Sequence, residues 1–93
     1  MQLEIDHLME YIQNSGCMFI RNGTEHNPEQ AVNHISKKYM YYNKRITTTE
    51  EFIDFCASKS TLSHKSYKIN CPGQPVIESK VWLLNELKIF RNQ

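Results

Sequence analysis

The chain has 93 residues, of which 40% are hydrophobic and 23% are charged, which is enough for one domain and too little for two. Eleven basic and ten acidic residues leave a net charge of +1, so the global charge gives no reason to expect nucleic-acid binding. No apolar run approaches the roughly 20 residues of a transmembrane helix, and we expect a single domain over residues 1–93 without membrane insertion.

The chain begins at Met1 without the basic and apolar segments of an export signal. This start fits a cytoplasmic protein, and it fits equally an exported protein whose signal is replaced by Met1. Residues 3–14 carry apolar side chains at spacings of three and four, which predicts an amphipathic helix, and Gly16 follows as its left-handed end. Residues 17–20 form an apolar run that is too short for a helix and is expected to be extended and buried.

Two strong helix starts follow a turn at residues 21–24, where Asn-Gly supplies the positive φ angles. The sequence Asn-Pro-Glu-Gln at residues 27–30 resembles a capping box and predicts a helix that ends near residues 43–44. Thr47 and Thr48 are each followed three positions later by a glutamate, Glu50 and Glu51, and this pattern predicts the start of another helix. Residues 52–57 are apolar nearly all round, so this short helix is expected to be central.

Residues 58–66 are expected to form a polar loop, and the alternation in residues 67–70 predicts an extended segment. The Cys-Pro-Gly-Gln-Pro sequence at residues 71–75 is a turn that no helix or central strand tolerates. Ser79 is expected to cap a last helix that reaches about Arg91. Together these elements predict an all-α fold, a small bundle of about four helices with a short extended segment and irregular loops.

The three cysteines, Cys17, Cys56 and Cys71, include no C-x-x-C pair, which argues against a zinc ribbon or a thioredoxin-like redox motif. Cys56 lies in an apolar helical run and is expected to be a small buried hydrophobe. Cys17 and Cys71 lie in irregular or extended segments that suit a disulfide, with two free thiols as the alternative. Such a bridge would close a loop of about 54 residues, worth roughly 3–4 kcal/mol on the chain-entropy model.

Neither a metal nor another cofactor is expected. The histidines have no metal-binding spacing and form no H-E-x-x-H motif; they are His7, His26, His34 and His64. The adjacent Glu50 and Glu51 are explained by the dipole of a helix start, without acid–base chemistry. The serine-rich loop at residues 58–66 lacks the S-x-x-K motif, and its hydroxyls are expected to bond to their own backbone.

One polar grouping is a candidate binding site. Arg21 and Asn22 precede the second predicted helix, and His34 and Lys38 lie one turn apart on its flank. With the loop hydroxyls they form a basic, donor-rich candidate pocket for a carboxylate or a phosphate. The predicted contact set is Arg21, Asn22, His34, Lys38, Ser58, Ser60 and Ser63. The alternative is that Arg21 and Lys38 merely pair with surface acids.

Residues 15–17 followed by residues 19–23 resemble the opening motif of a bacterial family known as domain of unknown function 5329. Further matches are Ala31 with His34-Ile35 and Lys38-Tyr39, Thr49-Glu50-Glu51-Phe52-Ile53, Ala57-Ser58-Lys59-Ser60 with Leu62-Ser63 and Tyr67, and Trp82-Leu83-Leu84 with Leu87 and Arg91. The resemblance covers nearly the whole chain. Departures fall in one loop, where Thr61, His64 and Ser66 replace the usual serine, glycine and proline.

Members of this family usually begin with an export signal, so the resemblance implies a periplasmic or secreted protein with a Cys17–Cys71 disulfide; the cytoplasm is the alternative. The family carries no established activity. We therefore expect a non-catalytic binding module for a protein partner or a small anionic ligand, for example an inhibitor or immunity-like protein acting on a cell-wall enzyme. The alternatives are a small hydrolase, with His34 as general base and a loop serine as nucleophile, and a purely structural protein.

Overall fold

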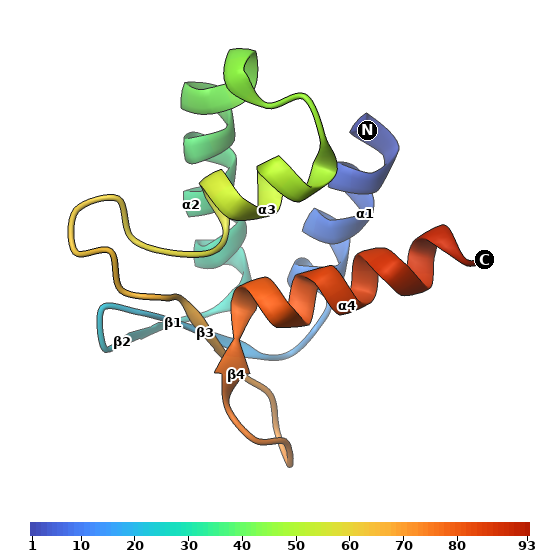
Figure 1. The fold of residues 1–93 in the computed structure, drawn as a ribbon. Coiled ribbons are helices and arrows are strands. Elements are labelled where there is room, and N and C mark those ends of the chain that lie inside the picture. The colour runs from blue at the N-terminus through green and yellow to red at the C-terminus, as the bar shows by residue number, and fades with distance from the viewer.

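The computed structural model describes all residues from Met1 to Gln93, and it combines helices with a small sheet (Figure 1). The helices are α1 (Gln2–Gln13), α2 (Pro28–Tyr42), α3 (Thr49–Cys56) and α4 (Ser79–Arg91), with a 3₁₀ turn η1 at Asn43–Arg45. The strands are β1 (Met18–Arg21), β2 (Thr24–His26), β3 (Lys68–Asn70) and β4 (Ile77–Glu78). The fold is therefore α+β, and the expectation of an all-α bundle is wrong.

The strands form one antiparallel sheet in the order β2-β1-β3-β4. Asn22 and Gly23 join β1 to β2 as a two-residue hairpin, and both have positive φ, 51° and 80° respectively. Asn-Gly is the pair that such a hairpin prefers. The turn was predicted but the hairpin was not, because β2 is a polar segment of three residues without the apolar alternation that marks a strand.

The helix starts follow the predicted capping chemistry. The Asn27 side chain accepts from the backbone N–H of Gln30, and the Gln30 side chain accepts from that of Asn27. The same reciprocal arrangement starts α3. Ser79 requires a correction: it is the first residue of α4 and not its cap, and its fully buried hydroxyl donates to the carbonyl oxygen of Ala57 at 2.6 Å.

One hydrophobic core lies between the helices and the sheet. Phe52 and Ile53 of α3 are fully buried, which agrees with the central position predicted for this helix. The core also contains Ile5, Leu8 and Ile12 from α1, Ile35 from α2, Phe19 and Ile69 from the sheet, and Leu83 and Leu87 from α4. The longest helix has only 15 residues, and none is long and apolar enough to cross a membrane.

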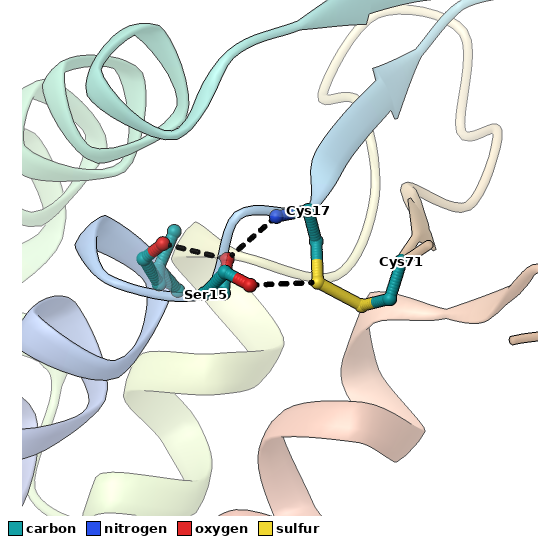
Figure 2. The surroundings of a disulfide bond; sticks show 4 residues. Ser15, Cys17 and Cys71 are labelled. Carbon is teal, nitrogen blue, oxygen red and sulfur yellow. Dashed lines mark hydrogen bonds between the residues drawn. A yellow bond between two sulfur atoms is a disulfide. The ribbon is translucent and has the colours of Figure 1, made fainter. Parts of the chain in front are cut away.

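Cys17 and Cys71 form a disulfide (Figure 2), which confirms the pairing that the family resemblance implies. Cys17 precedes β1 and Cys71 follows β3, so the bridge joins the ends of two neighbouring antiparallel strands. Ser15 fixes the approach to the bridge: its hydroxyl oxygen accepts from the Cys17 N–H at 3.1 Å, and its O–H donates to the carbonyl oxygen of Ile12 at 2.8 Å. Cys56 is a buried free thiol, as predicted.

Arg91, at the end of α4, links α1 to α3. Its guanidinium donates to the carboxylate of Glu4 at 2.7 Å and to that of Glu50 at 2.6 Å. The hydrogen bonds from Arg91 and from the Thr49 hydroxyl hold the pKa of Glu4 at about 2. These contacts tie the C-terminal helix to the rest of the core.

We expect Glu4→Gln to destabilise the protein modestly, by less than about tenfold in the unfolding equilibrium constant, because exposed ion pairs are screened by solvent. The folded-state pKa of Glu4 lies below the usual 4.5, so the ionised carboxylate contributes its full stabilisation at pH values above 4.5. This contribution is lost as the pH falls towards about 2. Urea unfolding at neutral and acidic pH measures it. Glu10→Gln on the same helix, where no ion pair forms, is the control, and equal effects of the two variants would contradict the assignment.

Candidate functional site

Arg21 at the end of β1 and Tyr67 directly before β3 adjoin the last paired residues of these two strands. Ile20 pairs with Lys68, and one further step in this antiparallel register brings Arg21 opposite Tyr67. Alternate residues of a strand share a face, so Arg21 lies on the same face as Phe19. Helix α2 packs against β1 and β2 and covers this face.

Helix α2 supplies His34 and Lys38, one turn apart as predicted. An Arg21 Nη1 atom lies 2.6 Å from His34 Nδ1 and 3.1 Å from Nε2, and His34 Nε2 lies 3.0 Å from the Tyr67 hydroxyl. Lys38 Nζ donates to the carbonyl oxygen of Lys59 at 3.0 Å and to the Tyr67 hydroxyl at 3.4 Å. We call Arg21, His34, Lys38 and Tyr67 the basic cluster.

Hydrogen-bond donors outnumber acceptors in the basic cluster. A guanidinium only donates, so one ring nitrogen of His34 accepts from Arg21. Arg21 Nη1 lies within hydrogen-bond distance of both nitrogens, and from the shorter distance we assign the acceptor role to Nδ1 and the ring proton to Nε2. This proton is donated to the Tyr67 oxygen, which also accepts from Lys38. The hydroxyl proton of Tyr67 then has no acceptor in the protein, and Arg21 bonds to no group except His34. The basic cluster therefore presents free donors.

Two cavities share Arg21, His34 and Tyr67 among their lining residues. The first has a volume of about 270 Å³ and lies between α2 and the β1–β2 hairpin, where Phe19 and Ala31 add apolar surface. The second, of about 330 Å³, is lined in addition by Lys38 and by residues of the loop between α3 and β3. Neither cavity is lined by an aspartate or a glutamate.

The positive charge of the basic cluster is not neutralised by the protein. Neither Arg21 nor Lys38 forms an ion pair with a carboxylate, which rules out the alternative that they merely pair with surface acids. Burial lowers the pKa of His34 to about 4, and four positive neighbours, Arg21, Lys38, His26 and Lys37, act in the same direction. Burial also lowers the pKa of Lys38.

We expect the His34 ring to titrate near pH 4 and Arg21→Gln to raise its pKa, because the nearest positive charge is removed. The folded-state pKa lies below the usual 6.5, so protonation favours the unfolded chain and stability falls as the pH drops from about 6.5 to 4. NMR titration of the ring protons measures this pKa. Lys44→Gln, which makes the same charge change on η1, is the control; an Arg21→Gln variant with an unchanged His34 pKa would contradict the proposed contact.

The three serines of the predicted contact set occupy different environments. Ser63 donates from its hydroxyl to the Asn22 side-chain oxygen at 2.6 Å and so ties the loop to the hairpin. Ser60 lines the second cavity, and its hydroxyl oxygen accepts from the backbone N–H of Ser63 at 3.4 Å. Ser58 is buried and donates to the carbonyl oxygen of Ile53 at 2.6 Å. Ser58 therefore completes the end of α3 and lines neither cavity.

No serine hydroxyl is hydrogen-bonded to His34, whose partners are Arg21 and Tyr67. The hydrolase alternative depends on a nucleophile–base pair that the structure does not contain. Tyr67 is the member of the basic cluster that the predicted contact set omits. The alternation of residues 67–70 was a usable signal, because it places Tyr67 on the same inward face as the buried Ile69.

Fold and site together define a small disulfide-bonded α+β protein with a basic cluster beneath one helix. The chain belongs to a family of unknown function, DUF5329, whose model matches residues 1–91, and this confirms the resemblance found in the motifs. It is also similar to "Uncharacterized protein YfeK" of Salmonella typhimurium, with 44% identity over 55 residues. The match covers 59% of this chain and 46% of that protein, so it spans about half the length of the relative. No solved structure matches the chain.

Proposed function

We propose that the protein is a binding domain for a small anionic ligand, which the basic cluster contacts through Arg21, Lys38 and Tyr67. The observation that supports this most strongly is the set of free donors at two cavities without an acidic residue. The basic cluster lines both cavities, so the oxygens of an anion bound there can accept from these donors. The planar fork of an arginine suits a carboxylate or a phosphate in particular.

In this proposal His34 positions the other groups and stays neutral. It accepts from Arg21 and donates to Tyr67, so it holds the guanidinium and directs the free Tyr67 proton away from its own ring. Its low pKa, about 4, keeps the ring uncharged at neutral pH. Asn22 and Ser60 add polar groups at the margin of the second cavity.

A purely structural role accounts less well for the basic cluster, because it gives no reason for donors that the protein itself leaves unpaired. A cavity between α2 and the hairpin favours a small ligand over the flat contact of an inhibitor or immunity-like protein. The Cys17–Cys71 disulfide is compatible with an oxidising compartment. We propose the periplasm or the outside of the cell as the compartment, which the disulfide supports.

The test is a calorimetric titration of the oxidised protein with two anions, inorganic phosphate and phenylacetate, at constant ionic strength. At least one of them is expected to bind, and Arg21→Gln is expected to weaken that binding about 10- to 150-fold, the usual range for a hydrogen bond to a charged group. Lys44→Gln makes the same change in net charge and should bind like the wild type. Absence of binding by both anions, or equal affinity in the Arg21→Gln variant, would overturn the proposal.

A further inference from the structure

We infer that the ligand is a small monocarboxylate with an apolar body, seated in the cavity between α2 and the β1–β2 hairpin. This inference rests on the proposed function, specifies its ligand class, and narrows the site to the cavity that Arg21, His34 and Tyr67 line and that Lys38 does not. The observation is that the cavity with the free donors is also lined by Phe19, Ala31 and Ile35. A ligand that fills it must therefore combine an anionic group with apolar surface.

Polar and apolar lining residues follow one another along both β1 and α2, the two elements that form the cavity. On β1, Phe19 and Arg21 share a face and lie two residues apart, about 7 Å along the strand. On α2, Ala31 and His34 are three residues apart and so lie on the same side of the helix. Because Arg21 contacts His34, these two polar residues meet, and Phe19 and Ala31 precede them on β1 and α2. We call the part of the cavity at Arg21 and His34 its polar end and the part at Phe19 and Ala31 its apolar end. Ile35 follows His34, and the polar residues that complete the lining are His26, Gln30, Asn33 and Lys37.

The donors at the polar end suit a carboxylate better than a phosphate. The Arg21 guanidinium and the Tyr67 hydroxyl proton match the two oxygens of one planar carboxylate. Phosphate sites in proteins commonly add backbone N–H groups from a helix start. The start of α2 does not offer them all, because the Gln30 N–H is already bonded to the Asn27 side chain. Pro28, the first residue of α2, has no N–H to offer, so the anion is held chiefly by side chains.

The apolar end sets the size of the ligand body. The cavity volume of about 270 Å³ lies just below the usual range for ligand pockets, roughly 300–1,000 Å³, which indicates a small molecule. Each methylene that is buried there should raise the affinity about fourfold.

The experiment compares four probes by calorimetry on the oxidised wild-type protein: phenylacetate, acetate, phenylacetamide and inorganic phosphate. Ionic strength is held constant. Phenylacetate is expected to bind at least about tenfold more tightly than acetate, which lacks the ring. It is also expected to bind at least about tenfold more tightly than phenylacetamide, which lacks the charge, and more tightly than phosphate. In the Arg21→Gln variant phenylacetate should bind no more tightly than phenylacetamide, whereas in the Lys44→Gln variant it should keep its higher affinity.

The outcomes separate this inference from the proposed function. If phosphate binds at least as tightly as phenylacetate and Arg21→Gln abolishes its binding, the ligand class is wrong and the anion site stands. If acetate binds as tightly as phenylacetate, the apolar end plays no part and the inference also fails. If no probe binds, or if phenylacetamide binds as well as phenylacetate in both the wild type and Arg21→Gln, the inference and the proposed function fail together.

Discussion

Reduction of the Cys17–Cys71 disulfide is expected to lower the free energy of unfolding by about 4 kcal/mol. The bridge closes a loop with a sequence separation of 54, and reduction restores to the unfolded chain the conformational entropy that this closure removes. For a domain of this size the loss corresponds to a decrease of roughly 15–30 °C in Tm. Thermal unfolding with and without a thiol reductant measures it, with the redox state of the thiols checked by mass.

The control is a Cys17→Ser/Cys71→Ser double variant, which has no bridge to reduce. It should unfold near the temperature of the reduced wild type and should not respond to the reductant. A wild-type protein that is fully reduced by mass and yet keeps the Tm of the oxidised form would contradict the stabilising role. The bridge joins the start of β1 to the end of β3, and these two strands position Arg21 and Tyr67. Reduction should therefore also weaken ligand binding at the basic cluster.

Phe52→Ala is expected to have an effect of similar size, a loss of about 3–5 kcal/mol in the free energy of unfolding. Phe52 is fully buried at the centre of the core, and its ring meets that of Tyr39 edge-on with centroids 5.3 Å apart. Truncation leaves a cavity that α3, which packs against α1, α2 and α4, can close only in part. Small domains have about 5–15 kcal/mol of stability in all, so much of it should be lost.

Urea unfolding monitored by circular dichroism measures the change. Met40→Ala on α2, where the side chain is 76% exposed, provides the matched control and should change the free energy of unfolding by no more than about 0.5 kcal/mol. If Phe52→Ala is no more destabilising than Met40→Ala, the core is not centred on α3.

The helices of this fold are predictable from sequence because their signals are local. Asn27 with Gln30 at the start of α2 is a reciprocal cap that needs no tertiary partner, and the same holds for α3. The sheet is not predictable in this way. Residues 17–20 and 67–70 were expected to be extended, and they contain most of β1 and all of β3. The strands have only two to four residues each, and β1 pairs with β3 across a long separation, so the pairing that makes them a sheet leaves no local signal. Only the tertiary structure makes these segments strands.

The residues of the candidate site also differ in whether a local sequence signal could predict them. His34 and Lys38 could be grouped because helical spacing alone places them on one side of α2, and Arg21 because it follows a buried apolar run. The alternation of residues 67–70 places Tyr67 on the inward face, but only the pairing of β1 with β3 brings it beside Arg21. Ser58 was predicted to face the ligand because it lies in a polar loop. It is instead buried, since the carbonyl oxygen of Ile53 at the end of α3 needs a donor.

The most direct test of the anion site is its location in solution, measured by the amide chemical shifts of the oxidised protein during a titration with phenylacetate. We predict that the largest changes fall in β1, β2 and the first three turns of α2, together with Tyr67, and that Arg21→Gln removes them. The His34 pKa should also rise from about 4 when the anion binds, because a negative charge favours the protonated ring. Changes confined to α4 or η1, or no saturable change with either phenylacetate or inorganic phosphate, would contradict the account.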